Sequence, residues 1–145
     1  MPVQNSLLFI RVVTVLHRGV WRLTGGRIGP KLGRYDSLLL VTTGRKSGKK
    51  RVAPLLYFSS GDDLLVVASN GGNDETPGWY LNVVANPRAE IELGREKRSV
   101  TAQVAGPEEK ARLWPGITAV YANYDSYQER TKREIPVVVL KRASP

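Results

Sequence analysis

Short apolar runs separated by turn residues constrain the fold of this 145-residue chain more than any other feature. They are too short for helices of ordinary length, and Gly, Asp or Ser residues stand between several of them. Six such runs joined mostly by short connections favour a small antiparallel barrel over a fold of alternating strands and helices. The expected strands cover residues 37–43, 51–58, 64–69, 89–93, 99–104 and 135–140.

Two segments between these runs carry helical signals. One helix is expected over about residues 79–85, because Asn86 and Pro87 follow and the residue before a proline avoids the helical conformation. The other is expected to begin at Pro107 and to reach about residue 119, since a proline and two acids suit the first turn of a helix. The sequence therefore predicts a mainly β domain with a few helices.

Residues 1–34 are expected to form an amphipathic helix and a linker ahead of a domain over residues 35–145. Apolar residues at helical spacing fill residues 5–22, and arginines occupy much of the other face. Such a helix can lie on an anionic membrane or dock on the domain, and the sequence leaves both open. No secretory signal is evident, so a cytoplasmic protein is expected, with a peripheral fraction on the inner face of the cell membrane left open.

The composition excludes several classes of chemistry. The chain has no cysteine, which excludes disulfides, thiolate catalysis and Cys-ligated zinc, and His17 is its one histidine. A histidine-based metal site would need carboxylates, and a Ser–His–Asp triad would depend on that single residue. We therefore expect no metal, and we expect any demanding chemistry to be done by a bound cofactor.

The net charge of +9 is unevenly distributed along the chain. Residues 1–60 hold half of the 22 lysines and arginines but a single acid, Asp36. This basic half predicts an anionic partner, which could be nucleic acid, a lipid surface or a phosphorylated ligand. General solubility of a small basic protein is the alternative explanation.

The loop over residues 44–50, with Arg51 after it, concentrates this charge. Five cations and two glycines offer charge and backbone amides to a polyanion, and a solvated hairpin tip is the alternative. The loop is not a Walker A motif, because three residues rather than four separate its glycines and Lys50 stands where Ser or Thr is needed. Residues 69–72, Ser-Asn-Gly-Gly, suit either a close approach to a ligand or a plain turn.

Aromatic residues form a second candidate site. Tyr121, Tyr124 and Tyr127 recur every three residues, so on a helical segment they share one face. With Trp114 upstream they favour an aromatic wall that lines a ligand pocket over packing in the core, because each buried tyrosine hydroxyl needs a hydrogen-bond partner. Trp79, at the start of an expected helix, either covers a planar ring or belongs to the core.

The order and spacing of these motifs over residues 35–142 resemble the deazaflavin-dependent nitroreductase family, an actinobacterial group also described as F420H2-dependent quinone reductases. The resemblance implies an α+β, flavin-reductase-like split β-barrel of six to seven antiparallel strands. It also implies binding of coenzyme F420, an 8-hydroxy-5-deazaflavin whose tail carries a phosphate and a polyglutamate. The matching motifs are Val41-Thr42-Thr43-Gly44-Arg45-Lys46-Ser47-Gly48-Lys49, Arg51-Val52-Ala53-Pro54-Leu55, Ala68-Ser69-Asn70-Gly71-Gly72, Pro77, Trp79-Tyr80-Leu81-Asn82, Ala85-Asn86-Pro87 and Arg133-Glu134-Ile135-Pro136.

The resemblance also implies which residues bind the cofactor. The tail and its phosphate would be held by Arg45, Lys46, Ser47 and Arg51. The residues expected to run beside the cofactor and along the ring edge are Val52, Ala53, Pro54, Leu55, Leu56, Val67, Ala68, Ser69 and Asn70. Helix amides, an aromatic wall and the closure of the ring site would come from Gly78, Trp79, Tyr80, Leu81, Asn82 and Tyr124.

The implied reaction is hydride transfer from reduced F420 to an electron-poor small molecule such as a quinone, a nitroaromatic or an α,β-unsaturated carbonyl compound. The protein would supply a hydrogen bond or a proton to the acceptor, and an ordinary tyrosine pKa of about 10 suits an acid at neutral pH. The candidate catalytic residues are Ser69, Tyr121, Tyr124 and Tyr127.

Two alternatives compete with this interpretation. A split barrel could bind FMN instead, but FMN ends in a single phosphate and needs fewer cations than the loop offers. A nucleic-acid-binding barrel would stack bases on exposed aromatics, whereas these strands offer only Tyr57 and Phe58, so no nucleic acid is expected. The sequence leaves a monomer and a homodimer open.

Overall fold

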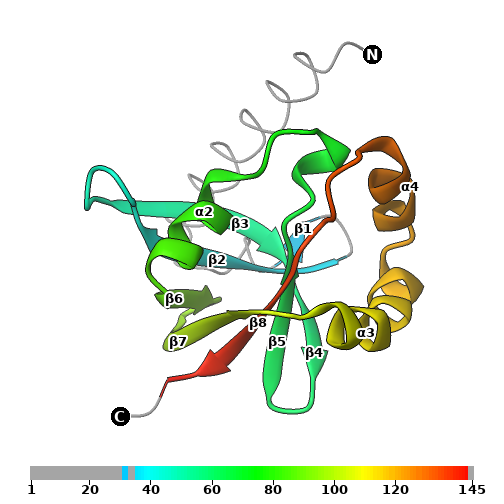
Figure 1. The fold of residues 1–145 in the computed structure, drawn as a ribbon. Helices are drawn as coiled ribbons and strands as arrows, with labels where there is room; N and C mark the ends of the chain where they lie inside the picture. Colours follow the sequence, from blue (N-terminus) through cyan, green and yellow to red (C-terminus); the bar gives the residue numbers. More distant parts are fainter. Residues whose placement is uncertain (1–30, 33–34, 144–145) are drawn as a thin grey trace.

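The computed structural model describes residues 31–32 and 35–143, which form a curled antiparallel sheet with helices around it (Figure 1). The described strands are β1 (Lys31–Leu32), β2 (Tyr35–Thr43), β3 (Lys50–Leu56), β4 (Phe58–Ser60), β5 (Asp63–Val67), β6 (Arg88–Leu93), β7 (Glu96–Val104) and β8 (Val137–Arg142). The described helices are the short 3-10 helix η1 (Asn70–Gly72), α2 (Gly78–Ala85), α3 (Pro107–Val120) and α4 (Asn123–Arg130).

The expected N-terminal helix over residues 5–22 lies outside the described residues, as does most of the predicted segment 1–34. The division at residue 34 therefore stays a prediction. Among the residues that are described, no helix is long and apolar enough to cross a membrane.

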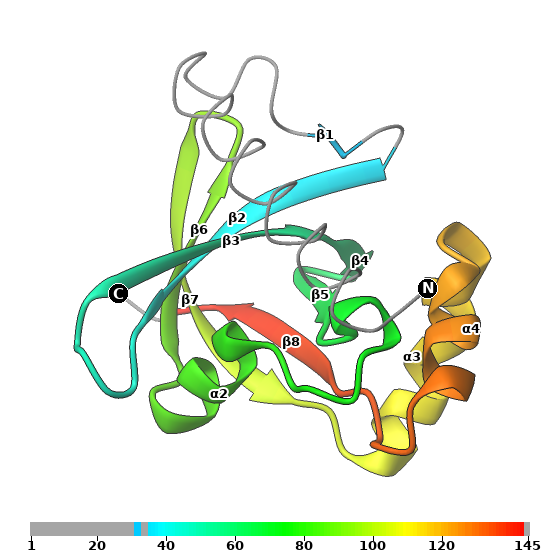
Figure 2. The same ribbon diagram turned by 90° about the horizontal axis from the view of Figure 1, so that it is seen from above.

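The strands follow the order β1-β2-β6-β7-β8-β5-β4, and β3 pairs with β2. Every pair is antiparallel. Because β2 pairs with both β3 and β6, and β3 approaches β5, the sheet curls into a split β-barrel (Figure 2). The expected fold class is confirmed, and the short connections expected between neighbouring strands form the hairpins β4–β5 and β6–β7.

The pair β5–β8 is buried on both faces, which explains why these strands are apolar without alternation. Val66 and Val138 contribute to a first cluster with α2, which we call the barrel core. Val67 and Val137 contribute to a second cluster with α3 and α4, which we call the helix-side core. Figures 1 and 2 place α2 and the pair α3–α4 on different sides of these strands.

The described part has more strands than the six to seven expected, partly because the run over residues 51–58 is two strands. The chain changes partners at Tyr57, whose N–H donates to the carbonyl of Asp36 at 3.2 Å. Before this point β3 pairs with β2, and after it β4 pairs with β5. Phe58 then enters the helix-side core, which requires the bend.

The last strand begins at Val137 rather than at residue 135. Ile135 donates its N–H to the side chain of Gln128 at 3.0 Å, so this N–H is unavailable to a neighbouring strand. Pro136 has no N–H to donate. The regular ladder therefore starts one residue after the proline.

Gly72 is expected to be the least replaceable glycine that the structure describes. Its φ is +81°, and an added Cβ would lie 2.9 Å from Cα of Tyr127. Gly72→Ala should lower the free energy of unfolding by about 3 kcal/mol, which combines left-handed strain with overpacking. Gly94→Ala is the matched control, because its φ is +59° with nothing within 4 Å, and it should cost about 1 kcal/mol. Equal losses in urea denaturation would contradict this account.

Candidate active site

The loop between β2 and β3, which we call the basic loop, is a tight turn closed by glycine. The N–H of Gly44 donates to the carbonyl of Lys49, and the N–H of Gly48 donates to the carbonyl of Gly44, both at 2.8 Å. A Cβ at Gly44 would lie 2.7 Å from Oγ of Ser47 and 3.2 Å from the carbonyl oxygen of Lys49, so a larger residue there would require the serine side chain or the turn to shift. Oγ of Ser47 also accepts the N–H of Lys49 at 3.2 Å.

The cations of the basic loop are exposed and lack acidic partners. None of them forms an ion pair with any described residue. Clustered like charge without counter-charge repels itself and attracts anions. The loop therefore fits a polyanionic ligand, and the cations concerned are Arg45, Lys46, Lys49, Lys50 and Arg51.

Asn82 on α2 fixes the basic loop from inside the protein. Its Oδ1 accepts the backbone N–H of Arg45 at 3.2 Å and Nη1 of the same residue at 3.1 Å. Its Nδ2 donates to Oγ1 of Thr42 at 3.1 Å, and both of these polar side chains are buried. The amide of Asn82 thus positions Arg45, and its predicted contact with the cofactor stays a prediction.

The segment after β5 contains an irregular turn over residues 68–73, which we call the Ser69 turn. Asn70, Gly71 and Gly72 have φ values of 46°, 64° and 81°. Ser69 is only 9% exposed, and its hydroxyl has no hydrogen bond to any described residue. A buried hydroxyl without a partner is unfavourable, so this one fits a hydrogen bond from a bound ligand.

Arg133 holds the Ser69 turn, a role that was not predicted from the sequence. Its Nε donates to the carbonyl of Asn73 at 3.0 Å, Nη1 to that of Ala68 at 3.1 Å and Nη2 to that of Ser69 at 2.8 Å. Burial lowers the pKa of Arg133, and the Asp74 carboxylate opposes this change. A turn rich in left-handed residues leaves backbone carbonyls without hydrogen-bond donors. The sequence Asn70-Gly71-Gly72 therefore indicated that a donor from elsewhere in the chain, such as Arg133, would bind this turn.

The tyrosines are not all on one helix, contrary to expectation. Tyr121 follows α3 with φ −132° and ψ 89°, a conformation that ends the helix, and only Tyr124 and Tyr127 lie on α4. The rings nevertheless meet: their centroids are 4.8 Å apart for Tyr121 and Tyr124, and 6.0 Å apart for Tyr124 and Tyr127. Trp114 adds a fourth ring, 6.3 Å from Tyr124. The expected aromatic cluster therefore forms from two helices and the link between them.

The tyrosine hydroxyls form a short polar chain. Nδ2 of Asn123 donates to the hydroxyl of Tyr121 at 3.3 Å, and that hydroxyl lies 3.1 Å from the hydroxyl of Tyr127. Burial, followed by the hydrogen bond to Tyr121, raises the pKa of Tyr127 to about 12. Burial and the neighbouring tyrosines also raise the pKa of Tyr124, whose hydroxyl has no hydrogen bond within the described part of the chain. Both groups therefore stay protonated at neutral pH, and their hydroxyls can donate hydrogen bonds.

The remaining predicted residues lie on β3, at the end of β5 and on α2. The segment from β5 to α2 runs from the α4 side of the molecule to the α2 side (Figure 2). Trp79 is buried in the barrel core, as the alternative interpretation of this residue allowed. Half-buried or exposed positions are taken by Val52, Ala53, Pro54, Leu55 and Leu56 on β3, and by Gly78, Tyr80 and Leu81 on α2, whereas Val67 and Ala68 are buried.

This fold and this site define a flavin-reductase-like split barrel. A solved F420-H2 dependent reductase, FDR-A, is 38% identical and matches with a TM-score of 0.66 over 72% of this chain and 93% of that chain. A structure described as a domain-swapped dimer is also 38% identical, with a TM-score of 0.67 over 72% of this chain and 79% of that chain. Both likenesses confirm the predicted barrel.

The family follows from the sequence comparisons. Residues 14–142 match the family of F420H(2)-dependent quinone reductases. An F420H(2)-dependent quinone reductase of Mycobacterium tuberculosis is 47% identical over 131 residues, which is 88% of each chain. The chain belongs to the F420H(2)-dependent quinone reductase family. It is an oxidoreductase that uses reduced coenzyme F420, so the predicted family, enzyme class, hydride transfer and cofactor are confirmed.

The raised pKa of Tyr127 predicts a loss of stability in alkali. Between pH 10 and about 12 the folded protein keeps this proton while the unfolded chain releases it. The stabilisation is therefore fully present below pH 10 and is lost as the pH rises towards 12. Urea denaturation should show stability falling over this range, and Tyr127→Phe should fall less steeply. Identical slopes for the two proteins would contradict the assignment.

Proposed function

We propose that the deazaflavin of F420 lies beside the Ser69 turn, with its anionic tail on the basic loop and the hydride acceptor against the tyrosines of α4. One observation carries this arrangement: the basic loop, whose cations form no ion pair with a described acid, lies on one side of the Ser69 turn, and the tyrosine cluster of α4 lies on the other (Figure 2). A ligand with a charged tail and a planar reactive end matches this polarity.

The residues present fit F420 at both ends. A phosphate and a polyglutamate carry several negative charges, which Arg45, Lys46 and Arg51 are placed to bind. FMN ends in one phosphate and leaves most of these cations without a partner. The hydroxyl of Ser69, which bonds no described residue, is available to the ring edge. When bound, reduced F420 supplies the hydride.

The tyrosines supply the proton side of the reaction. A quinone that receives a hydride develops negative charge on an oxygen, and one further proton converts it to the hydroquinone. Tyr124 and Tyr127 stay protonated at neutral pH, so either hydroxyl can donate a hydrogen bond to that oxygen. Tyr121 orients the hydroxyl of Tyr127 through their contact at 3.1 Å.

The tyrosine hydroxyls also indicate the chemical class of the hydride acceptor. Quinones, nitroaromatics and α,β-unsaturated carbonyl compounds each combine an electron-poor centre with an oxygen that can accept from a tyrosine. The family description favours quinones. The similar structure described as a domain-swapped dimer supports a homodimer, one of the two states that the sequence leaves open.

Reversing one charge on the basic loop tests the placement of the tail. Lys46 makes no hydrogen bond or ion pair with the described residues, so Lys46→Glu should leave the fold intact. We expect it to weaken F420 binding by about tenfold at low salt, measured by tryptophan fluorescence. Arg95→Glu, in the turn between β6 and β7, makes the same change in net charge and should leave the affinity nearly unchanged. Equal weakening by both variants would contradict the proposed tail site.

Two hydroxyl deletions test the acceptor site. Ser69→Ala and Tyr124→Phe should each lower turnover of a good quinone acceptor by about 10-fold to 100-fold, because each removes a hydrogen-bond donor from the reacting groups. Tyr57→Phe is the control, since this tyrosine packs against the barrel core and not against the helix-side core that contains Tyr124. Unchanged turnover in both deletion variants would show that neither hydroxyl assists the reaction.

We further propose that residues 1–30 hold the protein weakly to an anionic membrane, near quinone acceptors. The support comes from Arg11, Arg18 and Arg22 on the polar face of the expected helix. The full chain should sediment with phosphatidylglycerol vesicles and much less with phosphatidylcholine vesicles. Changing the three arginines to glutamate should abolish this difference, and equal pelleting of both proteins would contradict the proposal.

A further inference from the structure

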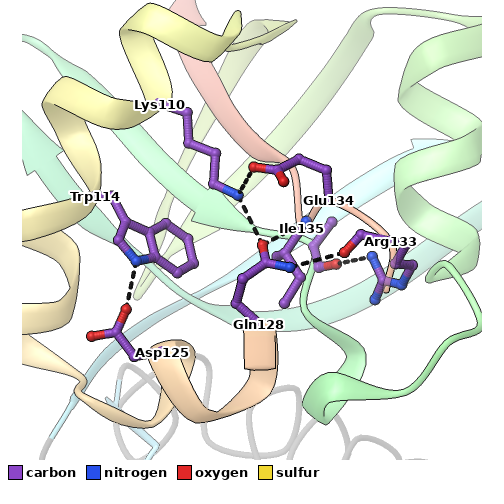
Figure 3. Close-up of polar contacts among 8 residues, drawn as sticks. Lys110, Trp114, Asp125, Gln128, Arg133, Glu134 and Ile135 are labelled. Atoms are coloured by element: carbon purple, nitrogen blue, oxygen red, sulfur yellow. Dashed lines mark hydrogen bonds and ion pairs between the residues drawn. The ribbon is translucent and has the colours of Figure 1, made fainter. Parts of the chain in front are cut away.

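The motif over residues 133–136 lies between α4 and β8, and the proposed function gives it no part in the reaction. The N–H of Ala68 donates to the carbonyl of Pro136 at 2.9 Å, which continues the β5–β8 pairing beyond the ladder. Gln128 holds the same segment from α4: its Nε2 donates to the carbonyl of Arg133 at 2.9 Å, and its Oε1 accepts the N–H of Ile135 at 3.0 Å (Figure 3). The hydrogen bonds of Gln128 therefore fix the main chain of Arg133, from which its side chain extends to the Ser69 turn.

The guanidinium of Arg133 gathers the carbonyls of Ala68, Ser69 and Asn73. These carbonyls come from both ends of the Ser69 turn, and a planar guanidinium with five donors can hold them in one fixed arrangement. The conformation of the turn, and with it the placement of the Ser69 hydroxyl, therefore depends on Arg133.

Further contacts tie the same turn to α4. Oγ1 of Thr131 donates to Oδ1 of Asp74 at 2.7 Å, just beyond the turn. Gly72 comes so close to α4 that an added Cβ would lie 2.9 Å from Cα of Tyr127. These contacts connect the Ser69 turn to α4 and the segment that follows it. Among the described residues that make them, Arg133 forms the most hydrogen bonds to the turn.

We infer that Arg133 is a positioning residue for hydride transfer, an inference that rests on the proposed function. It holds Ser69, on the cofactor side, at a fixed place relative to Tyr124 and Tyr127, on the acceptor side. Hydride transfer requires donor and acceptor in near-attack geometry, and a misplacement of about 1 Å costs about 100-fold in rate.

The test is single-turnover oxidation of bound F420H2 by the quinone menadione, followed by anaerobic stopped-flow absorbance. In the full-length Arg133→Met variant the rate constant at saturating menadione should fall by about 100-fold. The affinity for F420 should change by less than about threefold, because none of the tail cations contacts Arg133. Arg133→Lys should recover part of the rate, since an ammonium keeps the charge but not the fork of donors.

Lys110→Met is the matched control. Nζ of Lys110 donates to Oε1 of Gln128 at 3.0 Å, pairs with Oε1 of Glu134 at 2.6 Å and lies 4.6 Å from the ring centroid of Trp114 (Figure 3). Lys110 thus belongs to the same network but bonds no carbonyl of the Ser69 turn. Its replacement should lower the melting temperature and leave the single-turnover rate constant unchanged.

Three results would overturn the inference. The first is a rate constant for Arg133→Met within about threefold of the wild-type value, and the second is an equal rate loss in Lys110→Met. If Arg133→Met does not fold, Arg133→Lys and Thr131→Val are measured in its place. The third contradicting result is then a wild-type rate constant in both of these variants. A wild-type protein that binds no F420 or transfers no hydride would instead refute the proposed function itself, which distinguishes the two failures.

Discussion

The antiparallel pairing of β5 with β8 is the interaction on which the rest of this structure depends. Both faces of the pair are buried, so it belongs at once to the barrel core and to the helix-side core. Where the ladder ends, one strand continues into the Ser69 turn and the other is preceded by Arg133, which bonds that turn. The same hydrophobic burial that stabilises the barrel therefore also sets the position of the candidate active site.

The proposed reaction follows from the charged and polar groups on either side of the Ser69 turn. The basic loop attracts an anion without being neutralised by the described acids, and Asn82 fixes its direction through Arg45. On the other side, burial keeps the α4 tyrosines protonated, which suits them to donate to an acceptor that gains negative charge. In the proposed function the protein thus supplies binding, orientation and a hydrogen bond to the acceptor, while the cofactor supplies the hydride.

Local signals in the sequence predicted most of the fold and the general nature of the site. The hairpins, both helix starts and the charged turn follow from residues close to one another along the chain. The break at Tyr57 was not predictable, because the apolar run over residues 51–58 is continuous and only pairing with β5 divides it. The roles of Asn82 and Arg133 depend on partners 37 and 65 residues away, as in the bonds to Arg45 and Ala68, and no short-range pattern records such contacts.

The most direct test of the central claim is a titration of the full-length protein with F420 and with FMN, followed by the fluorescence of its three tryptophans at low and moderate salt. If the basic loop holds an anionic tail, F420 should bind with micromolar or tighter affinity that weakens as salt is added, and FMN should bind far more weakly. F420 binding that is insensitive to salt, or FMN binding of equal strength, would contradict the account.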